Sequence, residues 1–213
     1  EPYFHRFMER FPTVEELASS SLDEVLQMWS GLGYYARARN IHRSAQLIIK
    51  QHKGELPIDY ESLLNLPGIG KSTAGAILSL SGIEPKPILD GNVKRVLSRF
   101  FGVKGWSGES KVNKELWDLS ANSTPRDNFQ IYTQAIMDLG ATICLSRNPN
   151  CSICPIQRRC YAYQNHLVDK IPNKKPKKKK RTESKYFLMI VFDGNKLFLE
   201  RRKSKGIWGG LWS

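Results

Sequence analysis

Four cysteines lie close together late in the sequence, in the pattern Cys144-x6-Cys151-x2-Cys154-x5-Cys160. Four thiolates can hold either a tetrahedral zinc ion or a 4Fe-4S cluster. Zinc ribbons usually combine two close cysteine pairs, and only one close pair is present here, so the pattern favours the cluster. No cysteine precedes Cys144, which argues against the distributed disulfide framework of a small secreted domain.

An acidic residue stands at the start of a predicted amphipathic helix, in the segment Ile88-Leu-Asp-Gly-Asn-Val-Lys-Arg-Val96. Asp90 can serve as an N-cap, because aspartate is among the best capping residues. Its carboxylate can instead face a cleft between helical lobes and stabilise an oxocarbenium-like sugar, as carboxylates do in glycoside hydrolysis. Alone, the residue fits a cap better; the motif described next favours the catalytic role.

A short glycine-containing motif, Leu66-Pro-Gly-Ile-Gly-Lys-Ser-Thr73, ends one predicted helix and begins another. Gly68 and Gly70 permit a tight turn, and the unpaired N–H groups of the next helix make a seat for phosphate. The two glycines alone also fit a plain helix–turn–helix corner. The apolar flanks and the downstream Asp90 motif favour a helix-hairpin-helix element that grips DNA phosphates and reads no bases.

The elements that must position these residues are mostly helices. Hydrophobic spacing predicts helices around residues 22–29 (after a capping box at Ser21 and Glu24), 36–52, 60–66, 72–81, 93–100, 112–121 and 129–143. A β-rich segment at 186–192, a turn signal at 193–195 and a second β-rich segment at 196–200 predict a hairpin. The chain therefore reads as a helical domain followed by the opening of another domain.

Charge is concentrated in one short run. The 213 residues hold 33 Lys or Arg and 20 Asp or Glu, a net charge of +13, and residues 170–181 alone carry eight basic and no acidic residues. This run is either a solvated interdomain linker or a phosphate-binding tether. With 40% apolar and 25% charged residues and no membrane-length apolar run, membrane-spanning, collagen-like and wholly disordered classes are excluded.

Together these motifs resemble the iron–sulfur helix-hairpin-helix DNA glycosylases of the endonuclease III superfamily, and within it the MutY-type adenine glycosylases. The residues that carry the resemblance are Pro2–Met8, Gly31–Asn40, Ala74–Ser81, Pro87–Leu97 and Met137–Gly140. In addition, Gly206–Trp212 resembles the start of the family's C-terminal Nudix-like domain, which recognises 8-oxoguanine.

The resemblance implies a mainly α, two-lobed helix-hairpin-helix glycosylase fold with a 4Fe-4S loop, followed by the truncated start of a Nudix-like α/β domain. We expect a six-helix-barrel lobe with its first helices missing at 1–87, a cluster-containing lobe at 88–169, a basic linker at 170–185 and an incomplete Nudix-like domain at 186–213. We expect a monomer that is cytoplasmic and nucleoid-associated, although the lysine run could also be read as a nuclear signal.

The implied activity is hydrolysis of the N-glycosidic bond of adenine mispaired with 8-oxoguanine or guanine in duplex DNA, after the base is flipped out. Asp90 would stabilise or trap the sugar cation, Asn92 would position the sugar or phosphate, and Gln134 would contact the flipped adenine. Tyr34 would wedge into the duplex. The alternatives are that Tyr34 or Tyr35 is an ordinary core or rim aromatic residue, and that Gln134 is a polar residue on a helix surface. The DNA contacts are assigned to Tyr34, Arg37, Leu66, Gly68, Gly70, Lys71, Ser72, Thr73 and Lys94.

Two positions separate this chain from other members of the superfamily. Strand-cleaving enzymes carry a lysine where this chain has Ser72, and a serine forms no Schiff base, which favours a monofunctional hydrolase. The family's general-acid glutamate lies upstream of the match to Pro2, so we expect the chain as printed to be impaired, by roughly 10²–10⁴-fold or more. The alternatives are an endonuclease III-type glycosylase/lyase for oxidised pyrimidines and a non-catalytic DNA-binding iron–sulfur module.

Overall fold

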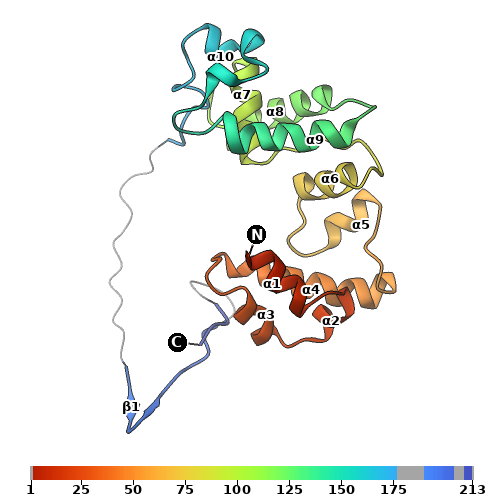
Figure 1. Cartoon of the computed structure of the whole chain (residues 1–213), viewed down its shortest axis with the longest axis vertical. Helices are drawn as coiled ribbons and strands as arrows, with labels where there is room; N and C mark the ends of the chain where they lie inside the picture. The colour runs from red at the N-terminus through yellow and green to blue at the C-terminus, as the bar shows by residue number, and fades with distance from the viewer. Residues whose placement is uncertain (1, 177–189, 204–208, 213) are drawn as a thin grey trace. The chain divides into compact units, whose positions relative to one another are not determined.

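The computed structural model describes residues 2–176, 190–203 and 209–212. The chain divides into two compact units, the first formed by residues 1–56 and 178–213 and the second by residues 57–177 (Figure 1). The boundary that we predict between residues 87 and 88 lies inside the second unit, and the lobe and domain assignments stay predictions. No helix in the described ranges is long and apolar enough to cross a membrane.

The first unit begins with four helices: α1 (Pro2–Arg10), α2 (Val14–Ser19), α3 (Leu22–Met28) and α4 (Tyr35–His52). The predicted capping box is confirmed, because Ser21 Oγ accepts from the Glu24 N–H while the Glu24 carboxylate accepts from the Ser21 N–H. Buried side chains of these helices and of Phe11, directly after α1, form one hydrophobic core: Phe11, Leu17, Val25, Leu26, Ala38 and Ala45. The long helix α4 packs against both α2 and α3.

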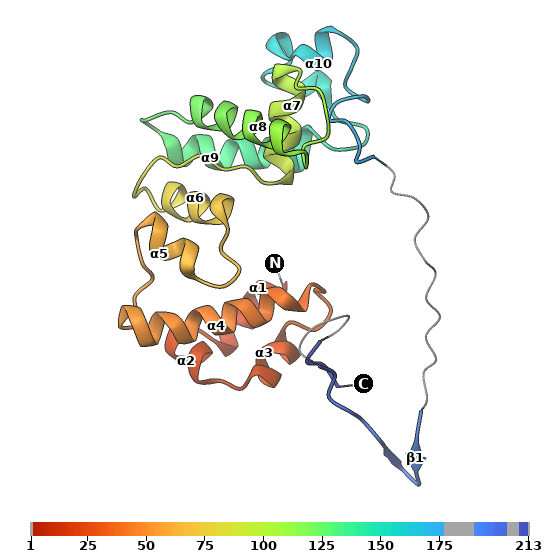
Figure 2. The ribbon, with the colours of Figure 1, turned by 180° about the vertical axis from the view of Figure 1, so that it is seen from behind.

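The second unit is also helical. Its α-helices are α5 (Tyr60–Asn65), α6 (Lys71–Leu80), α7 (Gly91–Phe101), α8 (Ser110–Ser123), α9 (Phe129–Asp138) and α10 (Tyr161–Gln164). A π-helix, η1 (Leu139–Ile143), and two 3-10 turns, η2 (Cys151–Ile153) and η3 (Gln157–Arg159), complete it. Helix α6 packs along α9, and α7 contacts α8, α9 and α10 (Figure 2). The prediction of a mainly α fold is confirmed.

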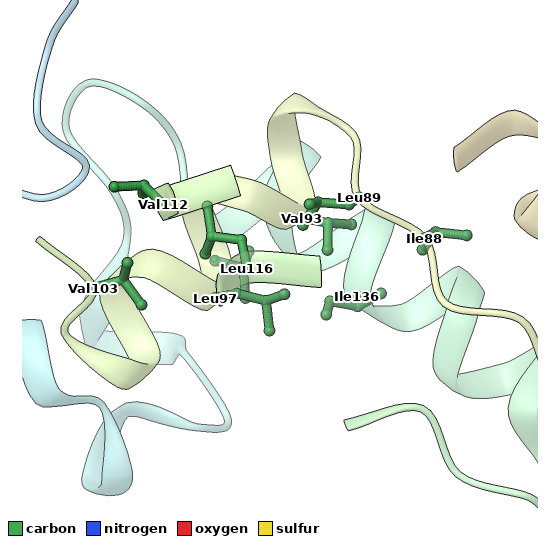
Figure 3. Packing of buried hydrophobic residues seen from close by; sticks show 9 residues of the cluster. Ile88, Leu89, Val93, Leu97, Val103, Val112, Leu116 and Ile136 are labelled. Atoms are coloured by element: carbon green, nitrogen blue, oxygen red, sulfur yellow. The ribbon is translucent and has the colours of Figure 1, made fainter. Parts of the chain in front are cut away.

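The core of the second unit centres on α7. Of the apolar positions that predict this helix, Val93, Val96 and Leu97 are buried, and Phe100, one turn further on, is half-buried. The buried positions pack with the segment before the helix and with α8 and α9 (Figure 3). The buried members of this cluster are Ile88, Leu89, Val93, Val96, Leu97, Val103, Val112, Leu116 and Ile136. Burial of each such side chain stabilises the fold by about 1.5–3 kcal/mol. The residue before Asp90 is thus held in the core.

Most predicted helices differ from the structure by one or two residues at their ends, and the helix expected over 129–143 differs in type. The helix expected over 129–143 ends as an α-helix at Asp138 and continues as the π-helix η1, where a Cβ on Gly140 would lie 2.6 Å from Asn92 Cβ. This close approach fits the observation that π-helical turns often occur where a helix must adjust to a neighbour. Helix α6 starts at Lys71, one residue earlier than expected.

The predicted hairpin is present but short. Strands β1 (Phe192–Asp193) and β2 (Lys196–Leu197) pair antiparallel, with Phe192 opposite Leu197 and Asp193 opposite Lys196. Asp193 therefore belongs to a strand, and Gly194 with Asn195 forms the two-residue turn, where the positive φ of Gly194 suits glycine. The rest of the expected first strand, residues 186–189, lies outside the described residues.

Candidate functional site

Asp90 is the N-cap of α7. Its Oδ1 accepts a hydrogen bond of 2.8 Å from the Val93 N–H, so the predicted capping role is confirmed. The cap uses one carboxylate oxygen, and among the described residues Oδ2 makes no hydrogen bond. A carboxylate at a helix N-terminus is favoured by the helix dipole, so Asp90 can be a cap and still present a negatively charged oxygen to a ligand.

The peptide that precedes Asp90 is held by two serine side chains. The Leu89 N–H donates to Ser72 Oγ at 2.9 Å, and Ser120 Oγ donates to the Ile88 carbonyl at 2.7 Å. These two backbone groups belong to the same peptide unit. Ser72 lies in the first turn of α6 and Ser120 lies on α8, so two helices fix the backbone next to Asp90.

The Asn92 side chain is held by Arg95, which also connects α7 to η1 and to the start of the cysteine loop (residues 144–160). Asn92 Oδ1 accepts from Arg95 Nη2 at 2.9 Å, and the same guanidinium donates to the carbonyls of Gly140 and Cys144, both at 2.6 Å. The Asn92 side chain therefore has a fixed orientation two residues after Asp90. Its predicted contact with sugar or phosphate stays a prediction.

The predicted hairpin has the expected form. Gly68 has a φ of +84°, a conformation that a residue with a side chain rarely adopts, and Gly70 stands at the N-cap of α6. No side chain caps α6, and its first turn contains no acidic residue, so its N-terminal N–H groups and dipole are arranged to receive an anion. Leu66 is buried beneath the turn, whereas Lys71 and Thr73 are exposed.

The four cysteines converge. Cys144, Cys151, Cys154 and Cys160 all line one cavity, which η1, the two 3-10 turns and α7 enclose, and none of them forms a disulfide. Burial raises the pKa of the Cys151 and Cys154 thiols, and the neighbouring cysteines raise it further. Among the described residues, no three or more His, Cys, Asp or Glu side chains are arranged to hold a single metal ion.

A buried arginine joins this cavity to the rest of the unit. Arg99 on α7 is only 3% exposed, and its Nη1 donates to Cys144 Sγ at 3.3 Å and to the Leu145 carbonyl at 2.6 Å. Its Nε donates to the Ile171 carbonyl at 2.9 Å. A guanidinium suits this position because its donors lie in a fixed fork and can satisfy several carbonyls at once.

The candidate wedge residue belongs to the first unit. Tyr34 is 81% exposed and has a φ of +49° at the N-terminus of α4, an unusual conformation for a residue with a bulky side chain. The Arg37 guanidinium lies over the Tyr34 ring at 5.2 Å and over the Trp29 ring at 5.7 Å. Strained, exposed residues of this kind often serve binding sites.

Not every predicted site residue is brought to Asp90. Gln134 is exposed on α9, and its amide donates to Asp138 at 2.9 Å, which matches the surface interpretation; its contact with adenine stays a prediction. Lys94 is half-buried in the first turn of α7. Tyr34 and Arg37 belong to the first unit, and the other predicted site residues belong to the second.

Sequence reasoning missed three supporting residues: Arg95, Arg99 and Ser120. The two arginines could have been found from the sequence, because Arg95 and Arg99 lie four residues apart and next to the apolar positions of the predicted helix. An arginine so close to the core needs hydrogen-bond acceptors such as backbone carbonyls. Ser120 had no such signal, because a lone serine in a helix is usually a surface residue.

The chain is similar in sequence to known DNA repair proteins. The sequence model of the HhH-GPD superfamily of base excision DNA repair proteins matches residues 1–122. An adenine DNA glycosylase of Buchnera aphidicola subsp. Acyrthosiphon pisum is 44% identical over 210 residues, which cover 99% of this chain and 60% of that protein. An adenine DNA glycosylase of Rattus norvegicus is 41% identical over 163 residues, covering 76% of this chain and 32% of that protein.

Solved structures show the same fold. A non-covalent endonuclease III–DNA complex superimposes with a TM-score of 0.67 at 26% identity and covers 78% of this chain and 76% of that chain. A thermostable thymine-DNA glycosylase also gives a TM-score of 0.67 at 26% identity, covering 77% and 76%. The chain spans about 60% of the length of the bacterial relative named above. By its match over more than half its length, the chain belongs to the HhH-GPD superfamily of base excision DNA repair proteins.

Proposed function

We propose that this chain belongs to a monofunctional adenine DNA glycosylase that hydrolyses the N-glycosidic bond of adenine mispaired with 8-oxoguanine or guanine in duplex DNA. The observation that carries the proposal is the match of 99% of the chain to a relative named adenine DNA glycosylase. The uncapped N-terminus of α6 and the available Oδ2 of Asp90 support it, since one can bind phosphate and the other can face a sugar.

In the proposed reaction, adenine is extruded from the duplex because its glycosidic bond is out of reach inside the stack. As the bond between C1′ and the base breaks, positive charge develops on the sugar, and the Asp90 carboxylate stabilises it. Water then adds to C1′, so the products are free adenine and an abasic site. A carboxylate fixed at Oδ1 by the Val93 N–H suits this task because it needs no reorganisation during the reaction.

Hydrolysis without strand cleavage follows from the side chain at position 72. A lyase needs an amine that forms a Schiff base with the sugar. Here a hydroxyl occupies the position, and it accepts a hydrogen bond from the Leu89 N–H. The endonuclease III-type alternative therefore lacks its nucleophile at this position.

We also propose the DNA contacts. The N–H groups at the start of α6 would bind a phosphate, with Lys71 and Lys94 adding positive charge. Tyr34 would enter the base stack, and Arg37 would hold its ring or a neighbouring phosphate. Gln134 would pair with an adenine edge through its amide, after exchanging its contact with Asp138.

We propose that the four cysteines hold a 4Fe-4S cluster. Four thiols around one cavity support a metal centre, and the presence of only one close cysteine pair in the sequence, Cys151 and Cys154, favours a cluster over zinc. The bound cluster would act as a cross-link that keeps the cysteine loop folded. Purified protein that is brown and contains four iron and four sulfide per chain would support this; colourless protein with one zinc ion would contradict it.

The remaining parts of the chain are assigned by resemblance. We propose that residues 170–185 are a basic linker and that residues 186–213 open a Nudix-like domain that recognises 8-oxoguanine. The hairpin of β1 and β2 is compatible with such an opening. Because the substrate is chromosomal DNA, the proposed location is the cytoplasm with the nucleoid.

The test is an excision assay with the full-length protein. Duplexes that contain A opposite 8-oxoguanine, A opposite guanine, C opposite 8-oxoguanine, or thymine glycol are incubated with enzyme in excess. We expect release of adenine from the first two, no reaction with the third, and an abasic site that is cleaved only after alkali treatment. Strand nicking at thymine glycol without adenine release would contradict the proposal and support the pyrimidine-specific alternative.

A further inference from the structure

The backbone just before Asp90 is held in an unusual way. Both polar groups of the Ile88–Leu89 peptide bond to serine hydroxyls that come from different helices: Ser72 on α6 accepts from the Leu89 N–H, and Ser120 on α8 donates to the Ile88 carbonyl. The peptide is buried, because Ile88 is 2% and Leu89 is 4% exposed. A buried peptide needs hydrogen-bond partners, and here both partners are side chains.

The two bonds fix one peptide plane from opposite ends. Ile88 and Leu89 also belong to the core cluster around α7 (Figure 3). The plane ends at the Leu89 Cα, one residue before Asp90. On the far side of Asp90 the cap to Val93 holds the carboxylate. Asp90 therefore lies one residue after a peptide that is hydrogen-bonded at both polar groups, and it begins a capped helix. The position of Oδ2 depends on both.

The close packing of Gly75 against Pro87, the residue before Ile88, supports the same conclusion. A Cβ on Gly75 would lie 2.5 Å from the Pro87 carbonyl oxygen, so α6 approaches this segment closely one turn after Ser72. Ser72 and Gly75 are thus two points at which α6, the helix after the predicted phosphate-binding turn, contacts the segment before Asp90. The position of α6 and the position of the carboxylate are linked within the second unit.

We propose that Ser72 and Ser120 are positioning residues, which set the reach of the Asp90 carboxylate toward the sugar by clamping the Ile88–Leu89 peptide. This inference rests on the proposed glycosylase function. The Ser72 hydroxyl then holds the Leu89 N–H, whereas the Ser72 backbone N–H, at the start of α6, is left to bind phosphate. Misplacement of a reacting group by about 1 Å commonly lowers a rate by roughly 100-fold, so small shifts of this peptide matter.

The experiment compares serines whose hydroxyls bond to backbone groups, in the full-length protein. The variants are Ser72→Ala, Ser120→Ala, the double variant and Ser72→Thr, which keeps the hydroxyl. The matched control is Ser79→Ala, because Ser79 is a buried serine on the same helix whose hydroxyl bonds to Lys86 instead of the clamped peptide. Each protein is assayed for single-turnover adenine excision and for affinity toward a duplex with uncleavable 2′-fluoro-2′-deoxyadenosine opposite 8-oxoguanine.

We expect Ser72→Ala and Ser120→Ala each to lower the excision rate about 10-fold and the double variant about 100-fold, with Kd unchanged within about twofold. Ser72→Thr, which keeps the hydroxyl, should recover most of the rate that Ser72→Ala loses, and Ser79→Ala should stay within about threefold of the parent. An equal loss in Ser79→Ala, or a Kd that rises in parallel with the rate loss, would overturn the inference, because the serines would then act through general stability or through binding.

Amide hydrogen exchange separates this inference from the proposed function. The Leu89 amide should exchange faster in Ser72→Ala and at the parental rate in Ser79→Ala, whatever the substrate. Absence of adenine excision by the parent protein would refute the proposed function alone. Parental excision rates in both alanine variants of a parent that does excise adenine would refute the clamp alone, as would an unchanged Leu89 exchange rate in Ser72→Ala.

Discussion

Replacing Arg99 by methionine should destabilise the second unit strongly. The guanidinium is 3% exposed and donates to two backbone carbonyls, those of Leu145 and Ile171, and to Cys144 Sγ. Methionine keeps the apolar stem but supplies no donor. The substitution therefore removes three hydrogen bonds without opening a large cavity.

The magnitude follows from the two carbonyls that lose their donor. Each buried carbonyl left without a donor costs about 1–3 kcal/mol of stability. Removing the guanidinium also removes the cost of burying its charge, which offsets part of this loss. We expect a net loss of about 3 kcal/mol. At about 2–4 °C per kcal/mol for a domain of this size, the melting temperature should fall by roughly 6–12 °C.

The assay is thermal unfolding of the full-length protein followed by circular dichroism, at fixed protein concentration and ionic strength. Arg126→Met is the control, because Arg126 is an exposed arginine of the same unit, and its melting temperature should change by less than about 2 °C. A shift below about 2 °C for Arg99→Met would refute the reasoning. The arginine would then contribute no more than a surface residue does.

Three further predictions concern other parts of the structure. Gly75→Ala places a Cβ 2.5 Å from the Pro87 carbonyl oxygen and should cost about 1–3 kcal/mol in urea unfolding, whereas Gly91→Ala, which meets nothing within 4 Å, should cost less than about 0.5 kcal/mol. Tyr34→Gly relieves a positive φ and removes an exposed ring, so unfolding should be unchanged or slightly harder while affinity for the A:8-oxoguanine duplex falls about 10-fold or more; unchanged affinity would reject the wedge. Cys154→Ser should lose most of the iron measured per chain, and full iron content would show that Cys154 is not a ligand.

The helical fold could be predicted because its signals are local. The capping box at Ser21 and the apolar stripe of α7 each specify an element through residues three or four apart, and both are confirmed. The π-helix after Asp138 could not be predicted in this way. It lies where Gly140 packs closely against Asn92, which is 48 residues away in the sequence.

In the candidate site, too, the local features could be predicted from the sequence and the long-range contacts could not. The motif residues stand out by type and spacing, and the structure brings the four cysteines to one cavity as their spacing predicts. The residues that hold the site, Ser120, Arg95 and Arg99, act through hydrogen bonds to backbone groups far away in the chain. Backbone groups are the same at every position, so no sequence pattern reveals which of them a side chain will meet.

Asp90→Asn tests the central claim most directly. Asparagine is as good an N-cap as aspartate, so the melting temperature should change little, while the negative charge that would stabilise the sugar cation is lost. In single-turnover excision of adenine opposite 8-oxoguanine by the full-length protein, we expect the rate to fall about 10³-fold or more, with binding to the uncleavable duplex retained. A rate within about threefold of the parent would contradict the account and leave Asp90 as a helix cap alone.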